Sequence, residues 1–168
     1  MHEKARYYID RLMMNKHPEG GYYNELYRSG EIFEADILPG RYSGNRAFST
    51  SIYFLLPGNE VSTFHRLRSD EIWHFYDGAP VTIYIIDEKG NLEKKVMGNN
   101  LENGEVLQAV IPQNSWFGAE VNDLRAFALV GCTVSPGFDF SDFELGSRDR
   151  LTAKFPQHSD LIKKLTKE

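Results

Sequence analysis

The sequence predicts an all-β protein, an antiparallel sandwich or barrel that carries helices at its two ends. Between about residues 20 and 140 the chain consists of short runs rich in β-branched and aromatic residues, each bounded by glycine, proline or other turn residues. No helical spacing of apolar residues interrupts these runs, and this favours antiparallel over alternating strand–helix architecture. Helical spacing occurs only near the two termini.

The terminal helices are expected over residues 3–14 and within 148–165, with Ser147 and Ser159 as N-caps. The first helix must end at HPEGG, because proline and paired glycines do not continue a helix. We expect one domain over residues 1–168 with a barrel core at roughly 20–140. The expected strands lie in GYYNELYRS, FSTSIYFLL, EIWHFYDG, PVTIYIID, EVLQAVIP and RAFALVGCTV.

Composition narrows the range of partners. The formal net charge is −5 and lysine and arginine do not cluster, so we expect no nucleic-acid partner. The single cysteine, Cys132, lies in an apolar run, where a buried and inert thiol is expected; one cysteine allows no internal disulfide. The chain contains no long apolar span and no signal-peptide core, so we expect a cytoplasmic protein with no membrane partner.

The stretch HRLRSDEIWHFYDG, residues 65–78, resembles the first motif of the cupin superfamily. His65, Glu71 and Gly78 match that motif, whereas Leu67 stands where cupins place a second histidine. The second cupin motif is matched less well, because Phe117 stands at the position of its ligand histidine.

A narrower resemblance covers nearly the whole chain. In order, HPEGGYYNELYRS, STSIYFLL, FHRLRSDEIWHFYDG, PQNSWFGAEV and GCTVSPGFDFSDFELG are similar to segments of the DUF985 (Cupin_5) family. The resemblance implies a double-stranded β-helix, the cupin jelly-roll barrel, for a family without a generally established reaction. Sugar-nucleotide epimerases on this fold use a histidine base without a metal, which makes His65 a candidate base.

Metal chemistry is disfavoured by the number of ligands. Catalytic zinc or iron sites usually need three side-chain ligands, and here only His65 and Glu71 occupy matching positions. His74 should point away from the barrel interior if Glu71 points inward, because side chains alternate along a strand. We therefore expect no metal cofactor; His65 and Glu71 could at most hold a divalent ion weakly.

His65 and Glu71 are the candidate catalytic residues. A histidine beside a glutamate in an apolar barrel can transfer protons, because burial and the neighbouring charge shift both pKa values. The alternative is that the two side chains only hydrogen-bond each other and rigidify the barrel.

Aromatic side chains are the candidate walls of a ligand pocket. Trp73 and Phe75 share the strand face of Glu71, and Trp116 and Phe117 follow the Pro112 turn. Each could stack on a flat or sugar-like ligand, or could serve only in core packing.

Four further residues complete the predicted ligand site. Tyr23 and Arg28 could reach the pocket edge, where the guanidinium would bind a carboxylate or phosphate or would pair with a surface acid. Ser51 and Tyr53 alternate along one strand and could line the interior, although the sequence does not fix which face points inward. His17 is interpreted as a turn residue.

Three classes of function remain. The first is a metal-poor pocket that binds a polar, carbohydrate-like metabolite or acts on it by acid–base chemistry of the isomerase or epimerase type. The second is a metal-dependent cupin enzyme such as a dioxygenase, isomerase or lyase, and the third is a non-catalytic storage or structural protein. The expected partners are a small-molecule ligand and a second copy of the chain in a homodimer, for which the aromatic segment SPGFDFSDFELG suits an apolar interface.

Overall fold

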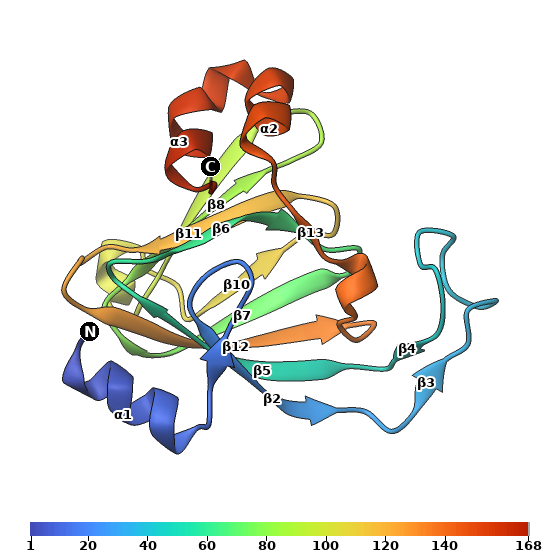
Figure 1. Ribbon diagram of the computed structural model, residues 1–168, viewed down its shortest axis with the longest axis horizontal. Helices are drawn as coiled ribbons and strands as arrows, with labels where there is room; N and C mark the ends of the chain where they lie inside the picture. The colour runs from blue at the N-terminus through green and yellow to red at the C-terminus, as the bar shows by residue number, and fades with distance from the viewer. Residues whose placement is uncertain (168) are drawn as a thin grey trace.

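The computed structural model describes residues 1–167 and consists of two antiparallel β-sheets that face each other (Figure 1). The larger sheet has the strand order β1-β2-β5-β12-β7-β10. Its strands are β1 (Asn15–Lys16), β2 (Tyr22–Arg28), β5 (Thr50–Pro57), β12 (Phe127–Ser135), β7 (Asp70–Gly78) and β10 (Gln108–Ile111).

The smaller sheet has the order β13-β6-β11-β8-β9. Its strands are β13 (Glu144–Leu145), β6 (Val61–Arg66), β11 (Trp116–Val121), β8 (Val81–Ile86) and β9 (Leu92–Met97). A separate hairpin of β3 (Ile32–Phe33) and β4 (Arg46–Ala47) extends away from the two sheets (Figure 1). The predicted all-β, antiparallel architecture is confirmed.

Short helices lie on the outer faces of the two sheets. Helix α1 (Glu3–Arg11) packs on the larger sheet, whereas α2 (Arg148–Lys154) and α3 (Ser159–Lys164) pack on the smaller one (Figure 1). The 3₁₀ turns are η1 (Leu101–Asn103), η2 (Phe140–Asp142) and η3 (Pro156–His158). The predicted cap at Ser159 is wrong: His158 is the N-cap of α3, because the 3₁₀ turn runs directly into that helix. No described helix is long and apolar enough to cross a membrane.

Three apolar clusters follow from strand alternation. The largest lies between the sheets, where Phe54 and Leu56 point from β5, while Leu55 points from the opposite face of the same strand toward α1. A third cluster, around Phe64 and Trp116, lies beneath the C-terminal helices. Both outer faces are therefore partly covered by helices.

Residues 136–143, called here the aromatic arm, connect β12 to β13. The arm is held by a buried ion pair in which Arg46 donates from Nε and Nη2 to the two carboxylate oxygens of Asp142 at 2.7 and 2.6 Å. Both side chains are 4% exposed. Because a buried pair of this geometry is costly to break, it fixes the arm to the β3–β4 hairpin.

Candidate functional site

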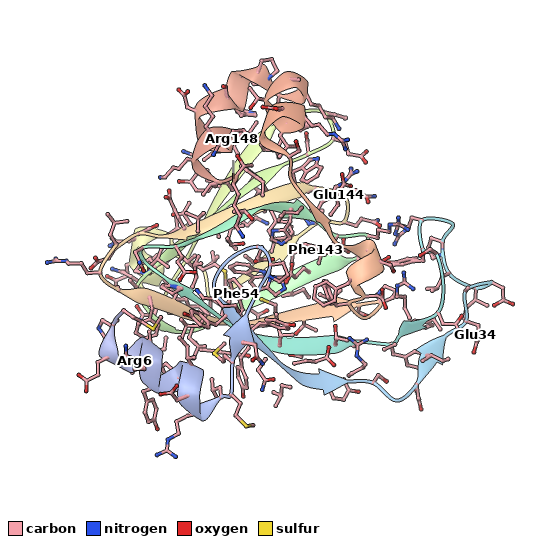
Figure 2. All side chains as sticks on the ribbon, viewed as in Figure 1. Arg6, Glu34, Phe54, Phe143, Glu144 and Arg148 are labelled. Atoms are coloured by element: carbon pink, nitrogen blue, oxygen red, sulfur yellow. The ribbon has the colours of Figure 1, made fainter. Side chains whose placement is uncertain are left out.

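A cavity of about 400 Å³ lies between the sheets, beside the aromatic arm. Phe54 from the larger sheet and Phe143 from the arm, both labelled in Figure 2, line this cavity. Most lining side chains are apolar or aromatic, with several ionisable groups among them. They are His17, Glu19, Tyr23, Glu25, Arg28, Thr50, Ile52, Phe54, His65, Leu67, Glu71, Trp73, Cys132, Val134, Phe138, Asp139, Phe140 and Phe143.

The turn after β1 carries Glu19 into the cavity wall. Gly20 and Gly21 have φ values of +114° and +70°, which glycine adopts far more readily than other residues. The Glu19 carbonyl accepts hydrogen bonds from the backbone N–H and the hydroxyl of Thr63, both at 2.9 Å. These bonds fix the turn to β6, and the Glu19 side chain is 7% exposed.

Glu19 is the acceptor at the centre of a polar cluster. Its Oε1 accepts from the Ser62 hydroxyl at 2.7 Å, and its Oε2 lies 3.1 Å from His65 Nε2 and 3.3 Å from His17 Nδ1. Burial raises the pKa of Glu19, but the charge of His65 and the hydrogen bonds from His17 and Ser62 outweigh it and hold that pKa below its usual value.

Both ring nitrogens of His65 face acceptors. Nδ1 lies 2.7 Å from the Thr63 carbonyl, which can only accept, so Nδ1 carries a hydrogen. Nε2 faces Glu19 Oε2, so one proton can be held between the imidazole and the carboxylate. Burial lowers the pKa of His65, so its ring holds this second proton less tightly than a free histidine would.

Glu71 occupies the opposite sheet, on β7, and has a different environment. Burial and the charge of Glu19 raise the pKa of Glu71 to about 8, so its carboxyl group is protonated at neutral pH. Within residues 1–167, neither Glu71 Oε2 nor the neighbouring Trp73 Nε1 has a hydrogen-bond partner. Cys132 and Trp73 act in the opposite direction and lower the pKa of Glu71, but no described donor bonds to Oε2. Burial raises the pKa of the Cys132 thiol, which stays protonated.

The structure brings five of the predicted site residues to the cavity. They are Tyr23, Arg28, His65, Glu71 and Trp73. The expected direct pair of His65 with Glu71 is corrected, because the ion pair of His65 is with Glu19, supplied by the glycine-rich turn. Arg28 pairs with an acid, Glu25, at 2.7 and 3.0 Å, and donates from Nη1 to the Phe138 carbonyl at 3.1 Å.

Ser51 and Tyr53, two of the predicted ligand-binding residues, do not line the cavity. Thr50, Ile52 and Phe54 line the cavity, and Tyr53 packs on the opposite face beside the helix α1 cluster. The reason is the alternation of β5, whose inward face is the one that meets Trp73 and Phe117 in the main core.

Three predicted aromatic residues do not line the cavity. Trp116 points to the cluster beneath the C-terminal helices, with the Arg66 guanidinium 4.7 Å from its ring centroid. Phe117 belongs to the core and contacts the His65 ring, with the ring centroids 4.0 Å apart. Phe75 packs against the same core.

The sequence interpretation missed Glu19 and assigned His17 only to a turn. The backbone at His17 does form that turn, but its side chain is 7% exposed and lines the cavity beside Glu19. The available signal was HPEGG itself, in which two adjacent glycines allow the backbone to approach β6 closely.

The side chains do not fit a cupin metal centre. Among the described residues no group of three His, Cys, Asp or Glu side chains is placed to hold a metal ion. Leu67 and Phe117 are buried and apolar, and both nitrogens of His65 face protein oxygens. His74 does not line the cavity, and its Nε2 lies 3.2 Å from the Thr133 hydroxyl.

Comparison with known proteins identifies the family. The model of the cupin superfamily family Cupin_5 (DUF985) matches residues 6–146. The chain belongs to this family. A curated relative of this DUF985 cupin, the uncharacterized protein YML079W of Saccharomyces cerevisiae, is 32% identical over 143 residues, which cover 80% of this chain and 71% of the relative.

Solved structures confirm the cupin fold. Protein SO0799 from Shewanella oneidensis is 42% identical to the DUF985 cupin with a TM-score of 0.88, and 97% of each chain is covered. A hypothetical protein from Leishmania major is 34% identical with a TM-score of 0.87, covering 98% of this chain and 99% of the other. An oxalate decarboxylase is only 19% identical with a TM-score of 0.54; the match covers 92% of this chain and 38% of that one, a likeness of fold alone.

Proposed function

We propose that this cupin binds a small polar metabolite in its cavity and catalyses proton transfer on it, in the manner of an isomerase or epimerase. The observation that carries the proposal is the pair of oppositely shifted acids in one cavity. Glu19 and His65, whose pKa values are both lowered, can accept a proton on one side of the cavity, and Glu71 holds its own proton on the other side. Environments that push the pKa values of two titratable groups apart are typical of acid–base sites.

The chemistry would run between the two sheets. The Glu19–His65 pair would remove a proton from the carbon next to a carbonyl group, and Glu71 would donate its proton to the resulting enolate. Glu19 is the group that meets the substrate: its carboxylate would take the proton and pass it to His65 Nε2, 3.1 Å away, while His65 Nδ1 keeps its own hydrogen on the Thr63 carbonyl.

The cavity volume favours this function over a storage role. A barrel filled by its own aromatic residues would leave no room for a ligand, whereas this one retains about 400 Å³ beside ionisable groups. The poor fit to a metal favours acid–base chemistry over a metal-dependent reaction.

Deuterium incorporation tests the proposal. The protein would be incubated in D₂O with hydroxy ketones, free sugars and their phosphates, and the hydrogens next to each carbonyl would be followed by NMR. We expect exchange that falls at least about 100-fold in Glu71→Gln, the usual scale for loss of a general acid or base. Absence of exchange in every compound, with the folded wild-type protein, contradicts the proposed reaction.

A further inference from the structure

The polar side-chain atoms of β7 that lack hydrogen-bond partners indicate which groups a ligand must carry. Trp73 is 2% exposed and Glu71 is 7% exposed, both line the cavity, and Trp73 Nε1 and Glu71 Oε2 have no partner within the described chain. An indole N–H can only donate, so it requires an oxygen acceptor. The Glu71 carboxyl group can pair with a hydroxyl or a second carbonyl oxygen. A buried polar group left without a partner is costly, so these two atoms call for two neighbouring oxygens.

The charge of the lining disfavours an anionic ligand. Four of the described lining residues are acids, namely Glu19, Glu25, Glu71 and Asp139, against a single arginine, and of these acids Glu71 is uncharged at neutral pH. That arginine, Arg28, already uses Nε and Nη2 on Glu25 and Nη1 on the Phe138 carbonyl. A phosphate or carboxylate in the cavity would therefore meet ionised Glu19, whereas the charge of Arg28 is already paired with Glu25.

The remaining walls suit a compact ligand with apolar faces. Six aromatic rings line the cavity, and such rings stack on flat molecules and on the C–H faces of sugars. A volume of about 400 Å³ is near the lower end for small-molecule sites and suits a monosaccharide-sized compound better than a nucleotide sugar. The six rings are those of Tyr23, Phe54, Trp73, Phe138, Phe140 and Phe143.

We infer that the ligand is an uncharged hydroxy-carbonyl compound of up to monosaccharide size, with one oxygen on the Trp73 indole N–H and a second on the Glu71 carboxyl group. The inference deepens the proposed function and rests on it for the identity of the site. A site for such a ligand differs from a site that recognises phosphorylated or nucleotide-linked sugars.

The indole N–H signals provide a direct test, because the chain has two tryptophans. In the ¹⁵N-labelled full chain, Trp73 reports on the cavity, and Trp116, in the cluster beneath the C-terminal helices, is an internal control. Trp116→Phe assigns the two signals. The probes are dihydroxyacetone and D-xylulose, each compared with its own monophosphate.

We expect the uncharged probes to move the Trp73 signal downfield, to leave the Trp116 signal in place, and to bind at least about tenfold more tightly than their phosphates. Calorimetry of Trp73→Phe should show binding weakened about tenfold, the scale of one lost hydrogen bond. Equal or tighter binding of the phosphates, or an unmoved Trp73 signal with both uncharged probes, overturns the inference.

Deuterium incorporation into the same probes separates the two proposals. Binding of the uncharged probes without exchange supports the ligand class and refutes the proposed reaction. Exchange confined to the phosphates supports the reaction and overturns the ligand class.

Discussion

The two walls of the cavity shift the pKa values of their buried carboxyl groups in opposite directions. On the β6 side, the Glu19 carboxylate contacts the polar side chains of Ser62, His65 and His17, and its pKa is lowered. On the β7 side, Glu71 is equally buried but has an unpaired oxygen and a pKa raised to about 8. The difference shows that burial alone does not set the state of a carboxyl group; the number of donors around it does.

The contrast between Glu19 and Glu71 also indicates which of the two carboxyl groups stabilises the fold. A buried acceptor with several donors stabilises the folded protein, because removal of the acceptor leaves all of these buried donors without a hydrogen-bond partner. A buried carboxyl group with an unpaired oxygen, such as Glu71, makes no comparable contribution through that oxygen. We therefore expect variants of the two glutamates to differ sharply in stability.

The largest effect is expected for Glu19→Ala. Loss of this carboxylate leaves His65 and Ser62 without their acceptor, so the free energy of unfolding should fall by about 3–5 kcal/mol, as for other broken buried pairs. Urea denaturation at pH 7 measures it. Glu25→Ala, at a lining glutamate that is 37% exposed in its pair with Arg28, is the matched control and should cost at most about 1 kcal/mol. A loss below about 1 kcal/mol in Glu19→Ala would show that the cluster is not structural.

Glu71→Gln should change the pH dependence of stability. The folded protein keeps the Glu71 proton up to about pH 8, whereas the unfolded chain releases it near the ordinary pKa of 4.5. The unfolded state binds fewer protons in this window, so the contribution of Glu71 to stability falls as pH rises from about 4.5 to about 8, by about 1.4 kcal/mol per pH unit. Between pH 6 and pH 8 the free energy of unfolding of the wild type should fall by up to about 3 kcal/mol relative to that of Glu71→Gln.

Denaturant midpoints at several pH values measure this difference. The groups that face Glu71 are Glu19, Cys132 and Trp73, and of these Glu19 stays ionised and the Cys132 thiol stays protonated across the window. Parallel curves for wild type and Glu71→Gln would mean that Glu71 is ionised in the folded protein at neutral pH.

A smaller contrast is expected between two adjacent residues of β5. Thr50 accepts a hydrogen bond from the Phe138 N–H at 2.9 Å, so Thr50→Val should cost about 1 kcal/mol and loosen the aromatic arm. Ser51→Ala, on the other face of the strand, should change stability by less than about 0.5 kcal/mol. Thermal unfolding of both variants compares them, and equal losses would contradict the observed orientation of the strand.

The sequence predicted the fold well because short alternating runs and turn residues specify an antiparallel sheet locally. It located His65 and Glu71 because their spacing matches a motif, but it could not supply their partners. Alternation does not say which face of a strand points inward, so Ser51 and Tyr53 were chosen over Thr50 and Ile52. Glu19 was missed because a charged residue in a glycine-rich turn normally lies in solvent. Only the pairing of that turn with β6 buries it.

Infrared spectroscopy tests the central contrast most directly. A protonated carboxyl group absorbs apart from carboxylates, so the difference spectrum of wild type minus Glu71→Gln reports the state of Glu71 alone. We expect a protonated-carboxyl band at pH 6 that disappears as the pH passes about 8. A spectrum that shows only carboxylate from Glu71 at pH 6 would contradict it.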